Sequence, residues 1–353
     1  MDIRIIGAGL IGASIGLAAK QRGDSVTFED LNSENLRVAQ DLVGGDPKSS
    51  SPDLVVIATP PKQALTVLLE EFERNPQAMF IDICGLKSEL VHEIESFSEL
   101  ASRFCGSHPM AGRELSGPTA ARADLFQGAT WVLTPTSQTD PAVVEAARKL
   151  ASDLGAIVQV VPADLHDEVI STVSHLPQLM STILARALTH RTDDELGLSG
   201  QGLRDVTRLA ESNAKLWADL LIRNRRNVSM DLERVQKEIA EALIHLAKQD
   251  DLELEKFISK GNLEKSRIPG KHGGKSRDYV YLPIVIEDKA GQLAAIFDEC
   301  AVARVNVEDL FIEHSPGQET GLITLALSQD DANILRPHLV EKNWRVHALR
   351  ANR

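Results

Sequence analysis

The sequence predicts an α/β domain, then an all-helical domain, then a small α+β domain. Up to residue 162, short apolar runs alternate with helical patterns, which is typical of a doubly wound parallel sheet. From residue 163 to residue 263 the periodicity is helical with few turn signals, and strand patterns return from residue 279. At 353 residues, the chain has the length of two or three domains.

The first domain is expected to contain strands at residues 3–6, 25–29, 54–59, 78–83, 104–106, 130–133 and 157–161. The run LVVIAT at residues 54–59 is continuously apolar, as expected for a strand that is buried on both faces. Helices are expected between the strands, at residues 10–22, 32–43, 62–74, 88–101 and 141–154.

Residues 163–263 are expected to form the helical domain, in which Pro177 should kink its helix because proline lacks an N–H donor. Residues 264–278 (EKSRIPGKHGGKSRD) are typical of a linker. The third domain, residues 279–353, follows the order βαββαβ, with its strands at 280–286, 305–314, 321–327 and 345–349. Helical domains in this position often supply a substrate wall and a dimer interface, so fold-level analogy suggests a homodimer.

Composition and charge exclude several classes of function. Acidic residues outnumber basic ones by 51 to 38, a net charge of −13, whereas a nucleic-acid binder presents a basic face. No run of about 20 apolar residues is present, so we expect no membrane span. The three widely spaced cysteines make neither a disulfide framework nor a metal knuckle, which favours a cytoplasmic location and no metal site.

A dinucleotide site is predicted at the start of the chain. Gly7-Ala8-Gly9-Leu10-Ile11-Gly12 is a GxGxxG that follows a strand and opens a helix, where glycines let the backbone approach a pyrophosphate. Asp30 ends the next strand, where a carboxylate binds the adenosine ribose and repels a 2′-phosphate, so NAD is preferred over NADP. Thr59 and Pro60 complete the predicted cofactor site. The alternative is a Rossmann fold that holds no dinucleotide.

A histidine is the first candidate for catalysis. His108 lies in Gly106-Ser107-His108-Pro109, after a predicted strand, where the strand ends of an open α/β sheet face the ligand crevice. The near-neutral pKa of imidazole suits proton transfer during hydride chemistry. On residue type alone, a structural histidine is equally compatible with the sequence.

Four separated motifs resemble those of the prephenate/arogenate dehydrogenase family of tyrosine biosynthesis. They are SHPMAGRELSG (107–117), ADLFQGATWVLTP (123–135), VSHLPQ (173–178) and GLRDVTRLAESNAKLWADLLIRN (202–224), in order and at fitting spacings. The resemblance covers residues 1 to about 260. The third domain, with DKAGQL at 288–293 and VNV at 305–307, resembles an ACT regulatory domain.

The resemblance implies NAD-dependent oxidative decarboxylation of prephenate to 4-hydroxyphenylpyruvate, or of arogenate to tyrosine. In this reaction hydride leaves a ring carbinol for the nicotinamide, a base takes the hydroxyl proton, and loss of carbon dioxide aromatises the ring. The reaction needs a cofactor, one base and cations for the carboxylates, but no metal. The resemblance makes His108 that base; the sequence does not separate the two substrates.

The resemblance also implies a set of substrate-binding residues in the helical domain. Arg208 is expected to bind a carboxylate through its bidentate guanidinium, with Asp205 as its orienter, although an ion pair within the helix is the alternative. His175 and Gln178 are expected to contact the substrate from one helical face, and many relatives have a second histidine at the Gln178 position. On a straight helix His166 lies nearly opposite His175, so only the resemblance directs His166 inward.

Several other residues are interpreted in the same way. Glu114 could join the polar network around Arg208, or be a solvated loop carboxylate. Gly85 stands where the family usually has a serine that orients the catalytic histidine or the nicotinamide, and Ser88, Ser107 or a water could substitute for it. Lys87 is interpreted as an ordinary first-turn residue, and Trp217 as a core residue.

The third domain and the departures from the family pattern leave alternatives open. Gly291 and Asn306 lie where ACT domains bind amino acids, so L-tyrosine is the expected effector; a dimerising module without ligand is the alternative. A β-hydroxyacid-type dehydrogenase would rely on a lysine in a Gly-rich helical motif, which residues 200–205 (GQGLRD) lack. Gly85 makes a catalytically silent amino-acid sensor conceivable.

Overall fold

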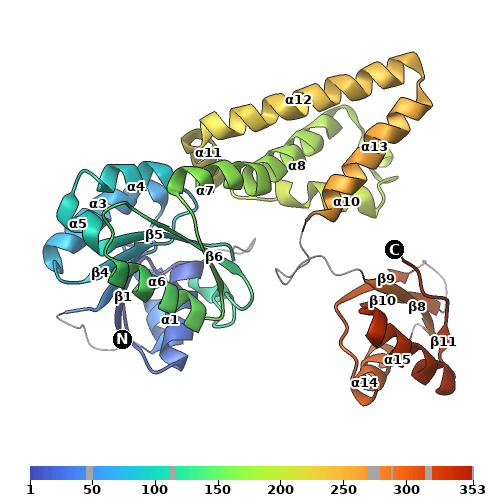
Figure 1. Cartoon of the computed structure of the whole chain (residues 1–353), viewed down its shortest axis with the longest axis horizontal. Helices are drawn as coiled ribbons and strands as arrows, with labels where there is room; N and C mark the ends of the chain where they lie inside the picture. Colours follow the sequence, from blue (N-terminus) through green and yellow to red (C-terminus); the bar gives the residue numbers. More distant parts are fainter. Residues whose placement is uncertain (45–50, 112–116, 269–278, 288, 315–319, 352–353) are drawn as a thin grey trace. The chain divides into compact units, whose positions relative to one another are not determined.

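The computed structural model describes residues 1–44, 51–111, 117–268, 279–287, 289–314 and 320–351 (Figure 1). The chain divides into two compact units, Met1–Ile258 and Ser259–Arg353. The first unit contains a mixed β-sheet and a group of helices, and the second contains a small antiparallel sheet. Among the described helices, none is both long and apolar enough for a membrane crossing.

Seven strands of the described residues form the sheet of the first unit, in the order β2-β1-β3-β4-β5-β6-β7. They are β1 (Asp2–Ile6), β2 (Ser25–Glu29), β3 (Leu54–Ile57), β4 (Met79–Asp82), β5 (Phe104–Pro109), β6 (Thr130–Pro135) and β7 (Ile157–Val160). Strands β1 to β5 are parallel, which confirms the Rossmann-like prediction. The sheet departs from the parallel arrangement at one place, where β6 pairs antiparallel with β5. In the described part of the β5–β6 connection, the one helical segment is a 3₁₀ turn at Pro118–Ala120, too short for a crossover.

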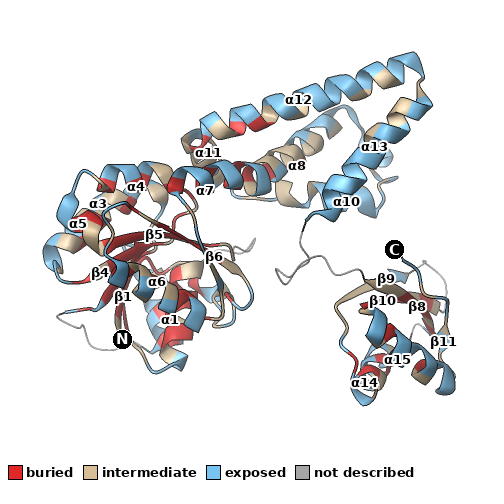
Figure 2. Ribbon diagram, viewed as in Figure 1, coloured by how far each residue is buried: buried red, intermediate tan, exposed pale blue. Residues whose placement is uncertain are grey.

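Helices cover both faces of this sheet. They are α1 (Leu10–Gln21), α2 (Ser33–Val43), α3 (Pro61–Arg74), α4 (Ser88–Ile94), α5 (Ser98–Arg103) and α6 (Pro141–Asp153). Alternate residues of β3 join opposite core clusters: Leu54 and Val56 pack with α1, α2 and α6, whereas Val55 and Ile57 pack with α3, α4 and α5. All four are fully buried, as predicted for a strand with two covered faces. Figure 2 shows the neighbouring strands β4 and β5 largely in the red of buried residues.

The helical part of the first unit follows β7. It consists of α7 (Ala163–Ile170), α8 (Leu176–Ala187), α9 (Asp193–Leu196), α10 (Gln201–Thr207), α11 (Ala214–Arg223), α12 (Arg225–Lys248) and the start of α13 (Asp251–Ser266). Between α7 and α8, residues Ser171–His175 form a π-helical turn that ends two residues before Pro177, which agrees with the predicted irregularity. Helix α13 continues to Ser266, into the segment predicted as a linker from residue 264.

The second unit has the predicted βαββαβ order. Its elements after α13 are β8 (Val280–Glu287), α14 (Gln292–Val302), β9 (Asp309–His314), β10 (Thr320–Leu327), α15 (Gln329–Glu341) and β11 (Arg345–Val346). The four described strands form an antiparallel sheet in the order β11-β8-β10-β9. Helices α14 and α15 both contribute to the apolar core of this unit.

Candidate active site

The loop between β1 and α1 has the backbone geometry that the glycine motif predicts. Gly7 has φ +109°, and a Cβ on it would lie 2.4 Å from the Ala58 carbonyl oxygen. A Cβ on Gly12 would lie 2.1 Å from the Gly7 carbonyl oxygen, so larger residues are excluded at both positions. A Cβ on Gly9 would meet open space, and α1 begins with neither a side-chain cap nor an acidic residue. The N–H groups of Leu10 and Ile11 at the start of α1 can therefore face an anion.

The other predicted cofactor residues surround this loop. Asp30 Oδ2 accepts a hydrogen bond from Ala8 N at 2.6 Å, which places the carboxylate against the loop. The Thr59 backbone nitrogen lies beside Gly7, and the buried Thr59 hydroxyl has no hydrogen-bond partner in the described part of the chain. Pro60 directly precedes α3. The glycine turn, the ribose-type carboxylate and the orphaned hydroxyl fit a dinucleotide.

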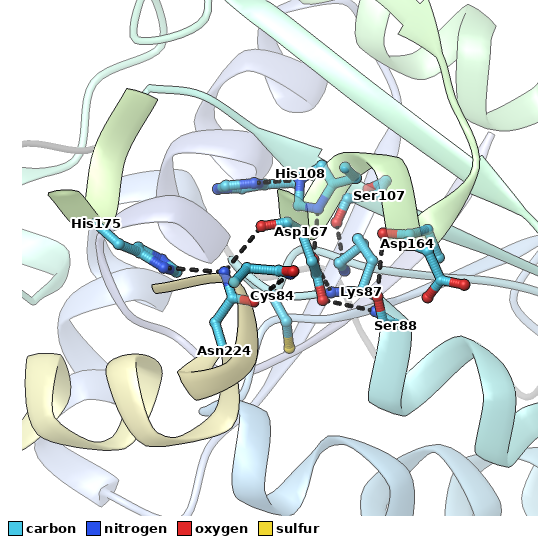
Figure 3. Close-up of polar contacts among 12 residues, drawn as sticks. Cys84, Lys87, Ser88, Ser107, His108, Asp164, Asp167, His175 and Asn224 are labelled. Atoms are coloured by element: carbon cyan, nitrogen blue, oxygen red, sulfur yellow. Dashed lines mark hydrogen bonds and ion pairs between the residues drawn. The ribbon is translucent and has the colours of Figure 1, made fainter. Parts of the chain in front are cut away.

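His108 lies within β5, not after it as predicted, because β5 continues to Pro109. Its Nδ1 is 3.0 Å from Nε2 of His166 in α7, and His166 Nδ1 is 2.7 Å from Asp167 Oδ1. The two imidazole rings meet edge to face with centroids 5.1 Å apart. Figure 3 shows His108 at the upper edge of a cluster of polar side chains, with Asp167 below it. The structure therefore brings His108 and His166 together.

This hydrogen-bond chain determines which nitrogen of His108 can act as a base. A carboxylate at Asp167 accepts a hydrogen bond from His166 Nδ1–H, so a neutral His166 has an unprotonated Nε2. His166 Nε2 then accepts from His108 Nδ1–H, which leaves His108 Nε2 with a free lone pair. Second-neighbour hydrogen bonds fix the tautomer of functional histidines in this way.

Electrostatics keep His108 neutral. Burial, followed by the nearby His166 and the Lys87 ammonium, holds the pKa of His108 well below its ordinary value of 6.5. Burial alone would raise the pKa of Asp167, but hydrogen bonds from His166 and from the Ser88 and Lys87 backbones outweigh it and lower this pKa. Near neutral pH, His108 is therefore a neutral imidazole and Asp167 is a carboxylate.

Asp167 connects the two parts of the unit. Its Oδ1 accepts from Lys87 N and its Oδ2 from Ser88 N, both at 2.9 Å, so it caps the first turn of α4. Its main-chain carbonyl accepts from Asn224 Nδ2 at 2.8 Å. No sequence pattern points to Asn224, and the one signal for Asp167 is that it directly follows a candidate histidine.

His175, at the end of the π turn, belongs to the same network. Asn224 Nδ2 lies 3.1 Å from His175 Nδ1, so the amide donates and the histidine proton lies on Nε2 (Figure 3). Burial is the main cause that lowers the pKa of His175. Trp217 meets the His175 ring at 89° with centroids 5.9 Å apart and is only partly buried. The interpretation of Trp217 as a core residue is therefore wrong.

Gln178 braces the turn that carries Arg208. Its Nε2 donates to the Leu209 carbonyl and to Ser212 Oγ, each at 2.7 Å, and the side chain is buried. Arg208 lies in the 3₁₀ turn Arg208–Ala210 with an exposed side chain. Asp205, the predicted orienter, accepts instead from Gln201 Nε2 at 2.6 Å. Glu114 lies outside the described residues.

Gly85 faces the basic nitrogen of His108. A Cβ built on Gly85 would lie 3.7 Å from His108 Nε2, which is ordinary van der Waals contact. The Ser88 hydroxyl donates to a carbonyl of α7 at 3.2 Å, and the Ser107 hydroxyl donates to the last carbonyl of β4 at 2.5 Å. Neither hydroxyl therefore substitutes for the family serine, and His166 orients His108 from the other ring nitrogen.

Lys87 is not the ordinary first-turn residue that the sequence suggested. Its side chain is fully buried and forms an ion pair with the fully buried Asp82. Lysine is rarely found fully buried unless it is paired, and sequence spacing gave no indication of the partner.

A dinucleotide-binding α/β domain followed by a helical domain is the architecture of a class of two-domain, NAD-linked oxidoreductases. The nucleotide-binding and dimerization domains of prephenate dehydrogenase match residues 15–160 and 162–260. The chain is 31% identical to a probable prephenate dehydrogenase of Streptomyces niveus, over 96% of this chain and 98% of that protein. It is 27% identical to the prephenate dehydrogenase of Bacillus subtilis, over 93% and 92%. The chain belongs to the prephenate dehydrogenase family.

Two solved structures resemble this chain over about three quarters of its length. Prephenate dehydrogenase from Aquifex aeolicus, in complex with hydroxyphenyl propionate and NAD⁺, has a TM-score of 0.70 and 27% identity, covering 76% of this chain and 99% of that one. Arogenate dehydrogenase from Synechocystis has a TM-score of 0.66 and 26% identity, with the same coverage.

Proposed function

We propose that this protein catalyses the NAD-dependent oxidative decarboxylation of prephenate or arogenate in L-tyrosine biosynthesis. The observation that supports the proposal most directly is the chain from Asp167 through His166 to His108, which leaves His108 Nε2 as a base. This base lies at the same sheet edge as the glycine loop. The named activities of the relatives support the same reaction class.

The proposed reaction assigns a proton step to His108. Bound NAD would supply the hydride acceptor, and Asp30 favours it over NADP. As hydride leaves the ring carbon that bears the hydroxyl group, His108 Nε2 accepts the proton of that hydroxyl. The positive charge that forms on His108 is stabilised by the nearby Asp167 carboxylate, much as a buried carboxylate stabilises an imidazolium elsewhere.

The helical part supplies the binding groups. His175 presents Nε2–H as a donor, because its Nδ1 is occupied by Asn224. Arg208 is assigned to a substrate carboxylate, and Gln178 supports the turn on which Arg208 lies. The dienone that hydride transfer forms then loses its carboxylate as carbon dioxide. The ring becomes aromatic in this step, which makes it favourable, and the step needs no further base.

The proposed activity is tested by following NADH formation with the purified full-length protein. Prephenate and arogenate are supplied separately, each with NAD and with NADP. Turnover of at least one substrate with NAD is expected. Absence of turnover with both would favour the alternative of a silent amino-acid sensor, and His108→Asn is the control that distinguishes enzymatic turnover from contamination.

We also propose that the protein is a homodimer formed through its helical domain. Ile239, Leu243 and Leu246 lie along one face of α12 at helical spacing and are each more than half exposed, at 52%, 61% and 58%. A contiguous exposed apolar face of this kind is typical of an interaction surface. Leu243→Glu should lower the mass measured by light scattering to that of a monomer. The exposed Glu238→Lys is the matched control and should leave the dimer intact.

The second unit is proposed to be an ACT-like module that binds L-tyrosine. Gly291 has φ +89° at the start of α14, and Asn306 is exposed and donates to Glu308 at 3.0 Å. If tyrosine inhibits through this unit, a chain that ends at Ser266 should keep its kcat within a few-fold and lose the inhibition. Equal inhibition of both chains would assign tyrosine to the active site and leave this unit as a ligand-free module.

A further inference from the structure

The end of β5 is held to β4 by side chains rather than by a β-ladder. The ladder between these strands pairs Phe80 with Phe104 and Ile81 with Cys105. Beyond it, Ser107 N donates to Asp82 Oδ1 at 3.1 Å, and the Ser107 hydroxyl donates to the Asp82 carbonyl. His108, the next residue of β5, is held on its other side by the ladder with β6, in which it pairs with Val132, so the Asp82–Ser107 contacts are what hold it from the β4 side.

Lys87 closes this arrangement. Its Nζ donates to the Ser107 carbonyl at 2.7 Å and contacts Asp82 Oδ2, while its backbone N–H donates to Asp167 (Figure 3). One residue therefore contacts the backbone directly before His108 and the carboxylate at the far end of the His108–His166 chain. With 0% exposure, the ammonium cannot reach a bound ligand.

The burial of this ion pair is not explained by stability alone. Removing two charges from water is costly, and well-packed apolar residues often serve stability equally well. The contacts of Lys87 instead converge on the catalytic base. We propose that Lys87 is a positioning residue for His108: its ammonium group fixes the strand end that carries the base and places a buried positive charge beside it. This proposal rests on the proposed role of His108 as the base.

The electrostatic part of the proposal has a definite sign. The groups that face His108 are His166 and Asp167 of α7, His175 of the π turn, and Lys87, paired with Asp82 of β4. Asp167 favours the imidazolium, whereas burial, His166, Lys87 and His175 oppose it. Removal of the Lys87 charge should therefore raise the pKa of His108, so that activity is lost at a higher pH on the acid side.

The test uses the full-length protein with Lys87→Met. We expect kcat to fall at least about tenfold and the acid limb of kcat/KM to move upward by about one pH unit, with the Kd of NAD nearly unchanged. Because Lys87→Met leaves Asp82 without its partner, a double variant with Asp82→Asn removes the unpaired charge. Its kcat should also fall at least about tenfold, since the Ser107 carbonyl still loses its donor.

Arg4→Met is the matched control, because Arg4 forms a largely buried ion pair with Glu71 elsewhere in the same domain. It should lower the melting temperature without moving the acid limb. A folded double variant with wild-type kcat, or a folded Lys87→Met with an unmoved acid limb, would overturn the proposal.

A second readout does not depend on turnover. In protein labelled with ¹⁵N-histidine, the imidazole signal assigned through His108→Asn reports the pKa of His108 directly. Lys87→Met should raise this pKa, and an unchanged titration would overturn the electrostatic assignment. Wild-type protein that turns over neither substrate would refute the proposed function, whereas the titration would still decide the role of Lys87.

Discussion

His166→Phe is the sharpest test of the hydrogen-bond chain that makes His108 a base. Phenylalanine retains a ring that can pack against His108 but removes the acceptor that lies 3.0 Å from His108 Nδ1. A buried N–H without a partner costs about 1–3 kcal/mol. His108 avoids this cost by moving its proton to Nε2, which removes the lone pair that the reaction needs.

The size of the effect follows from that cost. If the productive tautomer becomes less stable by about 1–3 kcal/mol, its population falls roughly 5- to 150-fold, and kcat falls with it. Complete removal of the base by His108→Asn should lower kcat by about 10²–10⁴-fold, and this variant sets the lowest kcat expected in the comparison. His166→Phe is therefore expected to lie between wild type and His108→Asn.

The assay is steady-state NADH formation near neutral pH with the Kd of NAD measured in parallel. His92→Phe is the matched control, because His92 is exposed on α4 and should change neither quantity. Wild-type kcat in folded His166→Phe would refute the tautomer argument. If His92→Phe lowers kcat as well, a loss in His166→Phe that is no larger would refute it too.

Three further predictions follow from the same geometry. Because burial lowers the pKa of His108, wild-type kcat/KM should stay high as pH falls through 6.5; an acid limb centred at or above that value contradicts the structure. Gly85→Ser should keep or raise kcat, since a Cβ there lies 3.7 Å from His108 Nε2, and a loss of activity would mean that the cofactor needs this space. Asp167→Asn should cost about 1–3 kcal/mol in urea unfolding at neutral pH. The pKa of Asp167 is lowered by folding, so its contribution is complete above an unfolded pKa of about 3.9 and is lost as pH falls through the folded value. The wild-type advantage should therefore narrow under acid conditions, and a constant difference would argue against an ionised Asp167.

Local patterns predicted much of the cofactor site and little of the polar cluster. The glycines of the β1–α1 loop and Asp30 obey constraints that lie within about 20 residues, which a single sequence displays. Lys87 and Asp167, by contrast, are 80 residues apart, and Asn224 is 57 residues from Asp167. Each of these residues is ordinary in its own segment. Their role arises only when α4, α7 and the end of α11 meet, so periodicity and spacing could not reveal it.

The reversal of β6 was missed for a related reason. An apolar run predicts a buried strand, but strand direction depends on the connection that precedes it. The described part of the β5–β6 connection contains one 3₁₀ turn and no helix long enough to return the chain to the other end of the sheet. A helical pattern is absent from residues 117–129 of the sequence as well, so the antiparallel pairing could have been inferred from connection length.

The π turn explains how His166 and His175 come to serve one network. On a regular helix, nine residues rotate the chain by about 900°, which places these two side chains on nearly opposite faces. A π turn adds one residue to a turn and changes this phase by about 100°. The turn is held by Asp231 of α12, which accepts from Ser171 Oγ at 2.7 Å and from Thr172 Oγ1 at 3.0 Å. Pro177 lies two residues after the turn and has no N–H to donate. The carbonyl four residues before it, that of Val173, therefore lacks its helical donor and lies inside this same turn. The proline thus makes the irregular turn less costly, and the irregular turn brings both histidines to the network that contains Asp167.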